Sequence, residues 1–147
     1  MITVVGGALV AAMVYHLNQR AARRERRAKA FADALNAIED YAEMPYRIRR
    51  RCPGAEVRQQ LTVEFCRIKS RIRFHEAWLR IEAPEVVDAY ENFERTARQQ
   101  SGPNASHAWT LPPIEDDAGM NLGCGYPRDQ IDRARDECVA AMLRSLG

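Results

Sequence analysis

Residues 56–81 read EVRQQLTVEFCRIKSRIRFHEAWLRI and contain neither glycine nor proline. Strong helix formers such as arginine, glutamate, glutamine and leucine recur throughout this stretch. Its apolar positions recur at intervals of three and four residues, so they share one face of an α-helix. These positions are Val57, Leu61, Phe65, Ile68, Ile72, His75 and Leu79. The pattern predicts a helix over 56–81 with one long buried face and basic side chains around it.

A second helix is predicted to follow directly. Pro84 suits the first turn of a helix, and the acidic Glu85 lies beside its positive end. Its inward positions are Val86, Tyr90, Phe93 and Ala97. We expect this helix to end near Ser101 and Gly102, because glycine commonly follows a helix terminus.

The last helix is predicted to begin at Pro127, with Arg144 near its negative end. Its inward positions are Ile131, Ala134, Cys138, Met142 and Leu146. Between these two helices, residues 102–126 include the Pro112-Pro113 pair and four glycines, which predicts a loop. Because this loop exceeds the usual length, it is either mobile or packed over the helices. The residues that would pack it are Trp109, Leu111 and Ile114.

Upstream, the sequence has no proline before Pro45, so a helix is expected to run unbroken to about Glu43. Its apolar positions follow a four-three-four spacing and need a partner. They are Phe31, Leu35, Ile38 and Ala42. A short basic connector then leads to a Pro-Gly turn. The expected fold class is all-α, with an N-terminal transmembrane helix that continues into an antiparallel bundle of three or four helices. The expected divisions are 2–17, a transmembrane helix; 18–44, a basic juxtamembrane helix; and 55–147, a cytoplasmic helical domain.

The transmembrane expectation rests on residues 2–17, ITVVGGALVAAMVYHL, which hold no charged side chain. Six basic residues follow this run and none precedes it, which disfavours a cleaved signal peptide. The positive-inside rule then places the amino terminus outside the cell membrane and the rest in the cytoplasm, as a single-pass protein. The alternative is a buried helix of a soluble protein, although no polar stripe interrupts the apolar run.

The charge is strongly asymmetric along the chain. Residues 18–80 hold 16 basic and 8 acidic side chains, whereas residues 81–147 hold 6 basic and 12 acidic ones. The basic residues nearest the leader are Arg20, Arg23, Arg24, Arg26, Arg27 and Lys29. Two interpretations carry equal weight: this cluster faces anionic membrane lipids and binds them, or it only sets the topology.

Gly7 and Ala11 form a small-x-x-x-small pair within the leader. This spacing lets two helix backbones approach closely, so helix-helix association into a homo-oligomer is one expectation.

No cluster in the sequence amounts to a catalytic, cofactor or metal signature. His75-Glu76 begins like a zinc-protease motif, but Leu79 occupies the position of the second histidine. The cysteines Cys52 and Cys124 have no regular spacing with each other or with a histidine. We therefore expect no enzyme activity, no cofactor and no metal, and all four cysteines to be reduced.

A second basic group could form a phosphate-binding surface for nucleic acid, although no nucleic-acid-binding fold accompanies it and this reading is not favoured. Its members are Arg47, Arg49, Arg50, Arg51, Arg67, Lys69, Arg71 and Arg73. The acidic second half of the chain is expected to neutralise them by packing alongside.

The leader, the arginine run and residues 37–51, AIEDYAEMPYRIRRR, resemble small uncharacterised single-pass membrane proteins of actinobacteria and their phages. The resemblance covers roughly the first third of the chain and implies no activity. The leading functional hypothesis is a membrane-anchored helical interaction module that presents a surface to an unidentified protein partner. Two alternatives stay open: a membrane-perturbing protein of the holin kind, and an enzyme with an unrecognised site.

Overall fold

Four α-helices account for most of the chain in the computed structural model, which describes residues 3–123 and 125–147, with side chains from residue 13 onward. They are α1 (Thr3–Arg49), α2 (Ala55–Glu82), α3 (Val87–Thr110) and α4 (Asp129–Leu146). Short 3-10 turns precede α3 and interrupt the last connection, at η1 (Pro84–Val86) and η2 (Asp117–Met120). No strand occurs in the described residues. The prediction of an all-α bundle is confirmed.

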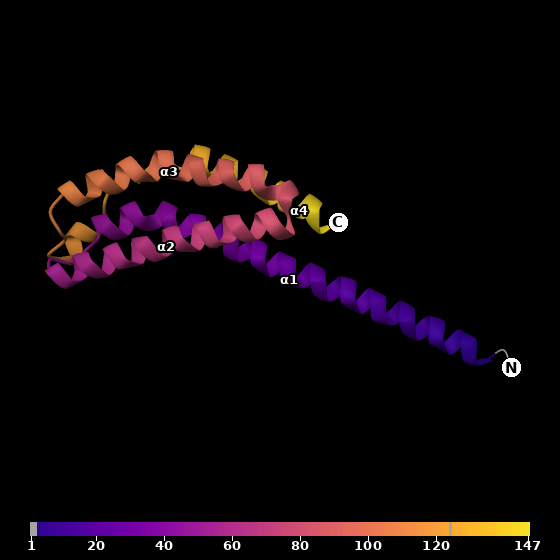
Figure 1. Cartoon of the computed structure of the whole chain (residues 1–147). Coiled ribbons are helices and arrows are strands. Elements are labelled where there is room, and N and C mark those ends of the chain that lie inside the picture. The colour runs from indigo at the N-terminus through magenta and orange to yellow at the C-terminus, as the bar shows by residue number, and fades with distance from the viewer. Residues whose placement is uncertain (1–2, 124) are drawn as a thin grey trace.

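The bundle is built around the carboxyl-terminal part of α1. Helices α2 and α3 pack against α1 and against each other, and α4 packs mainly on α3. Residues 13–30 of α1, here called the arm, lead out of the bundle (Figure 1). The arm contacts the bundle at its carboxyl-terminal end, where Arg27 binds Glu85 and Ser145. Phe31 is the first buried residue of α1 after the arm. The bundle therefore supports one end of a single long helix whose other end projects.

The predicted single-pass transmembrane helix is wrong. No helix in the described residues combines the length and the apolar character that a bilayer crossing requires. The physical reason is length: the charge-free run of about 16 residues rises roughly 24 Å as a helix, short of the about 30 Å of hydrocarbon. Arg20 then follows within the same helix. The placement in the cell membrane, with the amino terminus outside and the domain in the cytoplasm, is contradicted with it.

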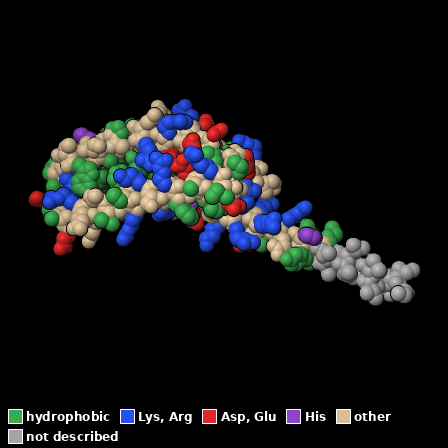
Figure 2. Space-filling view, viewed as in Figure 1, with side chains coloured by type: hydrophobic (Ala, Val, Ile, Leu, Met, Phe, Trp, Pro, Cys, Tyr) green, Lys and Arg blue, Asp and Glu red, His purple; other side chains and the backbone are tan. Residues whose placement is uncertain are grey.

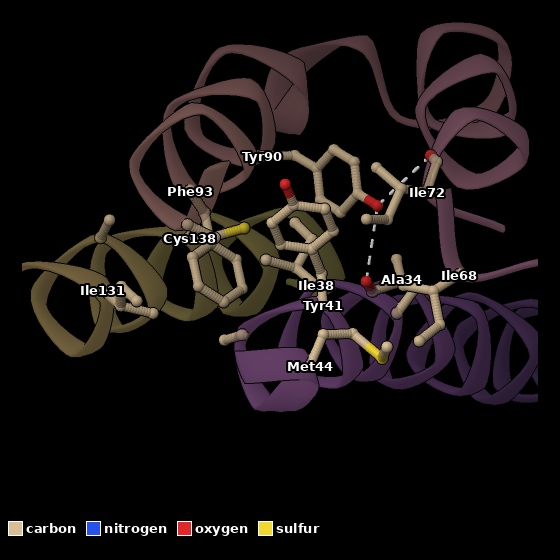
Figure 3. Packing of buried hydrophobic residues seen from close by; sticks show 14 of the residues in the cluster. Ala34, Ile38, Tyr41, Met44, Ile68, Ile72, Tyr90, Phe93, Ile131 and Cys138 are labelled. Atoms are coloured by element: carbon tan, nitrogen blue, oxygen red, sulfur yellow. Dashed lines mark hydrogen bonds between the residues drawn. The ribbon is translucent and has the colours of Figure 1, made fainter. Parts of the chain in front are cut away.

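The core joins all four helices (Figure 3). Tyr90 of α3 is fully buried, and its hydroxyl lies 3.5 Å from the carbonyl oxygens of both Ala34 and Ile72. Burial raises the pKa of the Tyr90 phenol well above its ordinary value, because the charged form loses its hydration. Phe93 and Cys138 fill the adjoining space between α3 and α4. Each apolar face predicted for these helices supplies residues to this core.

Two prolines lie inside helices that were predicted to end before them. Helix α1 continues through Pro45 to Arg49, and α3 continues through Pro103 to Thr110. A proline inside a helix costs roughly 3 kcal/mol, since it removes one hydrogen bond and crowds the preceding turn. In α1 this cost is offset by complete burial of Met44 and Ile48, at about 1.5–3 kcal/mol for each large apolar side chain.

The last turns of α3 are held by small side chains. Ser101, Ala105 and Ala108 are all buried, and they continue the inward face of α3 beyond Gly102. Small residues let α3 approach α1 closely along this length. If α3 ended at Gly102, this contact with α1 would be lost. The predicted end near Ser101 is therefore wrong by about two helical turns.

The connection between α3 and α4 is packed rather than loose. Ile114 is buried, and its amide donates to the carbonyl oxygen of Arg51 at 2.9 Å. Further along, the amide of Tyr126 donates to the Tyr46 hydroxyl at 2.7 Å. Helix α2 begins and ends within one residue of the prediction, and α4 begins two residues after Pro127.

Candidate interaction surface

Helix α2 carries a second stripe of uncharged residues on the side opposite its core face. Its seven members follow a 4-3-4-4-3-4 spacing, which keeps them on one line along a helix. They are Gln59, Val63, Cys66, Ser70, Phe74, Ala77 and Ile81, and all seven are exposed. We call this set the outer stripe. Its spacing is that of a helix contact, and its exposure shows that no other described helix covers it.

The largest members of the outer stripe are unusually exposed for apolar residues. The exposed fractions are 43% for Val63, 65% for Phe74 and 77% for Ile81. Single exposed apolar residues are common on protein surfaces, whereas an aligned set indicates an interaction site. Phe74 contacts only the edge of His75 among aromatic rings, with centroids 5.3 Å apart. The outer stripe is thus an open, uncharged line, with Val63, Phe74 and Ile81 as its large apolar members.

Positive charge borders the outer stripe. Arg73 and Arg80 both bind the carboxylate of Glu76, at 2.7 and 2.8 Å, and Arg80 also binds Glu91 at 2.6 Å. The Glu76 side chain is only 12% exposed, but those of Arg73 and Arg80 are 66% and 58% exposed. The hydrogen bond from Arg73 holds the pKa of Glu76 below its ordinary value. The carboxylate of Glu76 therefore lies beneath, and the outer surface of this cluster is formed by the two arginines and the 37%-exposed Glu91.

A groove lies along the other border of the outer stripe, between α2 and α1. Its volume is about 660 Å³, and Val63, Arg67 and Asp40 are among its lining residues. Asp40 accepts a hydrogen bond from Arg71 at 2.8 Å and lies 3.4 Å from Arg47. The groove is open and partly apolar, so a helix that lies on the outer stripe has room for side chains beside it.

The predicted basic cluster lies on the arm, where basic side chains gather as the helix leaves the bundle (Figure 2). Arg27 donates to Glu85 at 2.8 Å and to the hydroxyl and carbonyl oxygens of Ser145, at 2.6 and 3.3 Å. Arg26 donates to the carbonyl oxygen of Ala22 in its own helix at 3.2 Å. The other four members form no ion pair within the part of the chain that the structure describes. They are Arg20, Arg23, Arg24 and Lys29. A lipid-facing role for the cluster stays a prediction.

The association predicted through Gly7 and Ala11 falls on side chains outside those described. It stays a prediction as well.

The second basic group does not form one surface. Arg51 is buried, with an exposed fraction of 8%, and Arg49 donates to the carbonyl oxygen of Pro112 at 3.3 Å. Arg47 is paired with Glu64 as well as Asp40. These carboxylates come from the basic first half of the chain, so the expected neutralisation by the acidic second half is largely wrong. Nucleic-acid binding by this group, which was not favoured, is not tested by these contacts.

The polar groups that suggested chemistry are dispersed. His75 lies on the buried face of α2, and burial, with the charge of Arg71, lowers the pKa of its imidazole. Cys52 and Cys66 are exposed and Cys138 is buried, while Cys124 lies outside the described residues. Over residues 3–123 and 125–147, no three histidine, cysteine or acidic side chains lie close enough to hold a metal ion.

The outer stripe was missed by sequence reasoning, because the stronger apolar pattern of the core face dominates the same segment. Its signal was present as seven uncharged positions at helical spacing. Comparisons of the chain with protein-family models, curated proteins and solved structures found no match.

Proposed function

We propose that this protein is a non-enzymatic helical interaction module, whose outer stripe binds an amphipathic helix with acidic flanks from a protein partner. The observation that carries the proposal is the alignment of Val63, Phe74 and Ile81 on the exposed side of α2. An amphipathic helix presents apolar anchors at intervals of three and four residues, which matches this stripe.

Burial of the outer stripe supplies the driving force. Covering Phe74 and Ile81 contributes about 1.5–3 kcal/mol for each side chain that becomes fully buried. This gain is reduced by the loss of motion on association. Micromolar binding corresponds to about 8 kcal/mol, so these two side chains act as anchors and the other contacts of the partner helix must supply the rest. The existing core already holds α2 through Ile72 and Leu79, so docking does not require the bundle to rearrange.

The charges at the border decide which partner fits. Arg67, Arg73 and Arg80 are all exposed beside the outer stripe. A second copy of α2 laid on the same stripe would bring arginines toward arginines, which is unfavourable. Glutamate or aspartate at the edges of a partner helix would instead face these cations, and such complementarity sets specificity more than affinity.

The test uses two labelled helical peptides of 22 residues with leucine and isoleucine at the spacing of the outer stripe. One carries glutamate at its flanks and the other carries lysine at the same positions. Fluorescence anisotropy with the full chain should show at least tenfold tighter binding of the glutamate peptide. Sedimentation of the chain alone over the same concentrations tests for self-association.

Two double variants locate the binding. Phe74→Gln with Ile81→Gln should weaken binding of the glutamate peptide by at least tenfold. Met120→Gln with Leu143→Gln removes two other exposed apolar side chains and should leave binding within twofold. Equal binding of both peptides, equal loss in both variants, or dimerisation that the first variant abolishes would overturn the proposal.

A further inference from the structure

A hollow lies where the arm leaves the bundle, between α1 and the last turns of α2. Its volume is about 640 Å³, within the range of small-molecule sites, roughly 300–1,000 Å³. The side chains that define it are Gln19, Arg23, Arg26, Arg27, Trp78 and Glu82. We call this hollow the arginine notch. It is separate from the outer stripe, because none of the residues that line it belongs to the stripe.

The arginine notch has unused capacity to bind an anion. Arg23 forms no hydrogen bond or ion pair with the described residues, and Arg26 donates only to Ala22 of its own helix. Arg27 is held in place by Glu85 and Ser145, and its Nε is buried, so it contributes positive charge at the edge of the hollow rather than a free donor. Guanidinium groups bind phosphate oxygens with two parallel hydrogen bonds, so this set suits a phosphate.

An aromatic side chain and a carboxylate complete the arginine notch. Trp78 is half-buried and meets the ring of Phe31 edge to face, with centroids 6.1 Å apart and planes at 81°. Indole rings stack on nucleobases. Glu82 lies at the border of the same hollow, and its carboxylate is able to accept hydrogen bonds from amino or hydroxyl groups.

From this juxtaposition we propose that the arginine notch binds a nucleoside di- or triphosphate, with the phosphates on Arg23 and Arg26 and the base against Trp78. Arg27, fixed at the junction by Glu85 and Ser145, would then place its positive charge beside the bound anion. The three guanidinium groups favour a ligand with more than one phosphate, and Trp78 favours one that also carries a ring.

The test is a titration of the full chain with ADP at moderate salt, followed by fluorescence of Trp78. A Trp109→Phe background leaves Trp78 as the only tryptophan, and Trp109 lies elsewhere, against Arg51. ADP should quench this signal with saturation in the micromolar range. Calorimetry of the unmodified chain should give the same affinity, and Trp78→Ala should weaken it at least fivefold.

Two charge-matched double variants separate a site from a general attraction. Arg23→Gln with Arg26→Gln should weaken ADP binding at least tenfold. Arg20→Gln with Arg24→Gln removes the same charge from the same arm, outside the residues that line the arginine notch, and should change it less than twofold. Circular dichroism confirms that both variants stay helical.

Several outcomes would overturn the proposal. Equal weakening in the two double variants would mean that ADP binding depends only on the net charge of the arm. Pyrophosphate that binds as tightly as ADP would remove the role of Trp78. If a single-stranded oligonucleotide binds tenfold more tightly than ADP, the arm binds nucleic acid rather than a free nucleotide. Failure of ADP to bind would leave the peptide test of the outer stripe unaffected, because the two sites share no residue.

Discussion

The guanidinium of Arg51 lies over the ring of Trp109, with its Cζ 5.0 Å from the ring centroid. From this position it donates to the carbonyl oxygens of Ile48 at 2.9 Å, Ala108 at 3.0 Å and Leu111 at 2.6 Å. One buried cation thus caps the carboxyl ends of α1 and α3 together. Cations at helix carboxyl termini are favourable, because they pair with carbonyl groups that the helix leaves free.

Replacement of this cap should destabilise the bundle strongly. Arg51→Met removes the side-chain donor from the buried carbonyl of Ala108 and from the part-buried carbonyls of Trp109 and Leu111, at about 1–3 kcal/mol for each group that water cannot reach. We expect the free energy of unfolding to fall by roughly 3 kcal/mol in urea denaturation. Arg50→Met removes an exposed neighbouring arginine and should change it by less than about 0.5 kcal/mol. Similar values for the two variants would contradict the capping role.

The buried face of each helix could be predicted from the sequence. The continuation of two helices through a proline and the buried arginine cap could not. Spacings such as those of Phe31 and Ile38, or of Ile131 and Cys138, are local, and they identify a buried side wherever the helix lies in space. The persistence of helix through Pro45 and Pro103 depends instead on tertiary burial. Arg51 is the extreme case, because only the meeting of α1 with α3 turns one arginine of a basic run into a buried cap.

The candidate surfaces also combine features that the sequence indicates with features that depend on tertiary contacts. The six basic residues of the arm were found from composition alone, but Arg27 belongs to a junction with Glu85 and Ser145 that no sequence pattern indicates. The spacing of the outer stripe can be found in the sequence, but only the structure shows that none of the described helices covers it.

Alkaline pH should destabilise the bundle through Cys138. Burial raises the pKa of its thiol from 9.0 to about 12. Because the folded state holds this proton more tightly, the related stability is complete below pH 9.0 and is lost as pH rises toward about 12. Each fully shifted group contributes a slope of about 1.4 kcal/mol per pH unit. Urea denaturation from pH 8 to pH 11 should show this decline, which Cys138→Ala makes shallower and Cys66→Ala, at an exposed position, does not.

Mild acid should destabilise the bundle through His75. Burial, with a contribution from Arg71 and against the opposing charge of Asp33, lowers the pKa of this imidazole below 6.5. The unfolded chain therefore binds the proton first, so stability is complete above pH 6.5 and is lost as pH falls through the pKa of the folded state. His75→Leu should remove this component of the acid dependence, measured by urea denaturation between pH 7 and pH 5. His107→Gln, at an exposed position, should preserve it, and a slope unchanged in His75→Leu would contradict the assignment.

The two faces of α2 should lose very different amounts of stability when apolar side chains are removed. Leu79 is fully buried, so Leu79→Ala should lower the free energy of unfolding by about 2–5 kcal/mol through lost burial and a residual cavity. Phe74 is 65% exposed, so Phe74→Gln should change it by less than about 0.5 kcal/mol, although the side chain removed is larger. Thermal and urea denaturation of both variants measure the contrast. A large loss in Phe74→Gln would mean that the phenyl ring already supports the bundle. It would then not be free to bind a partner, because a surface kept for an interaction contributes little to the stability of the unbound chain.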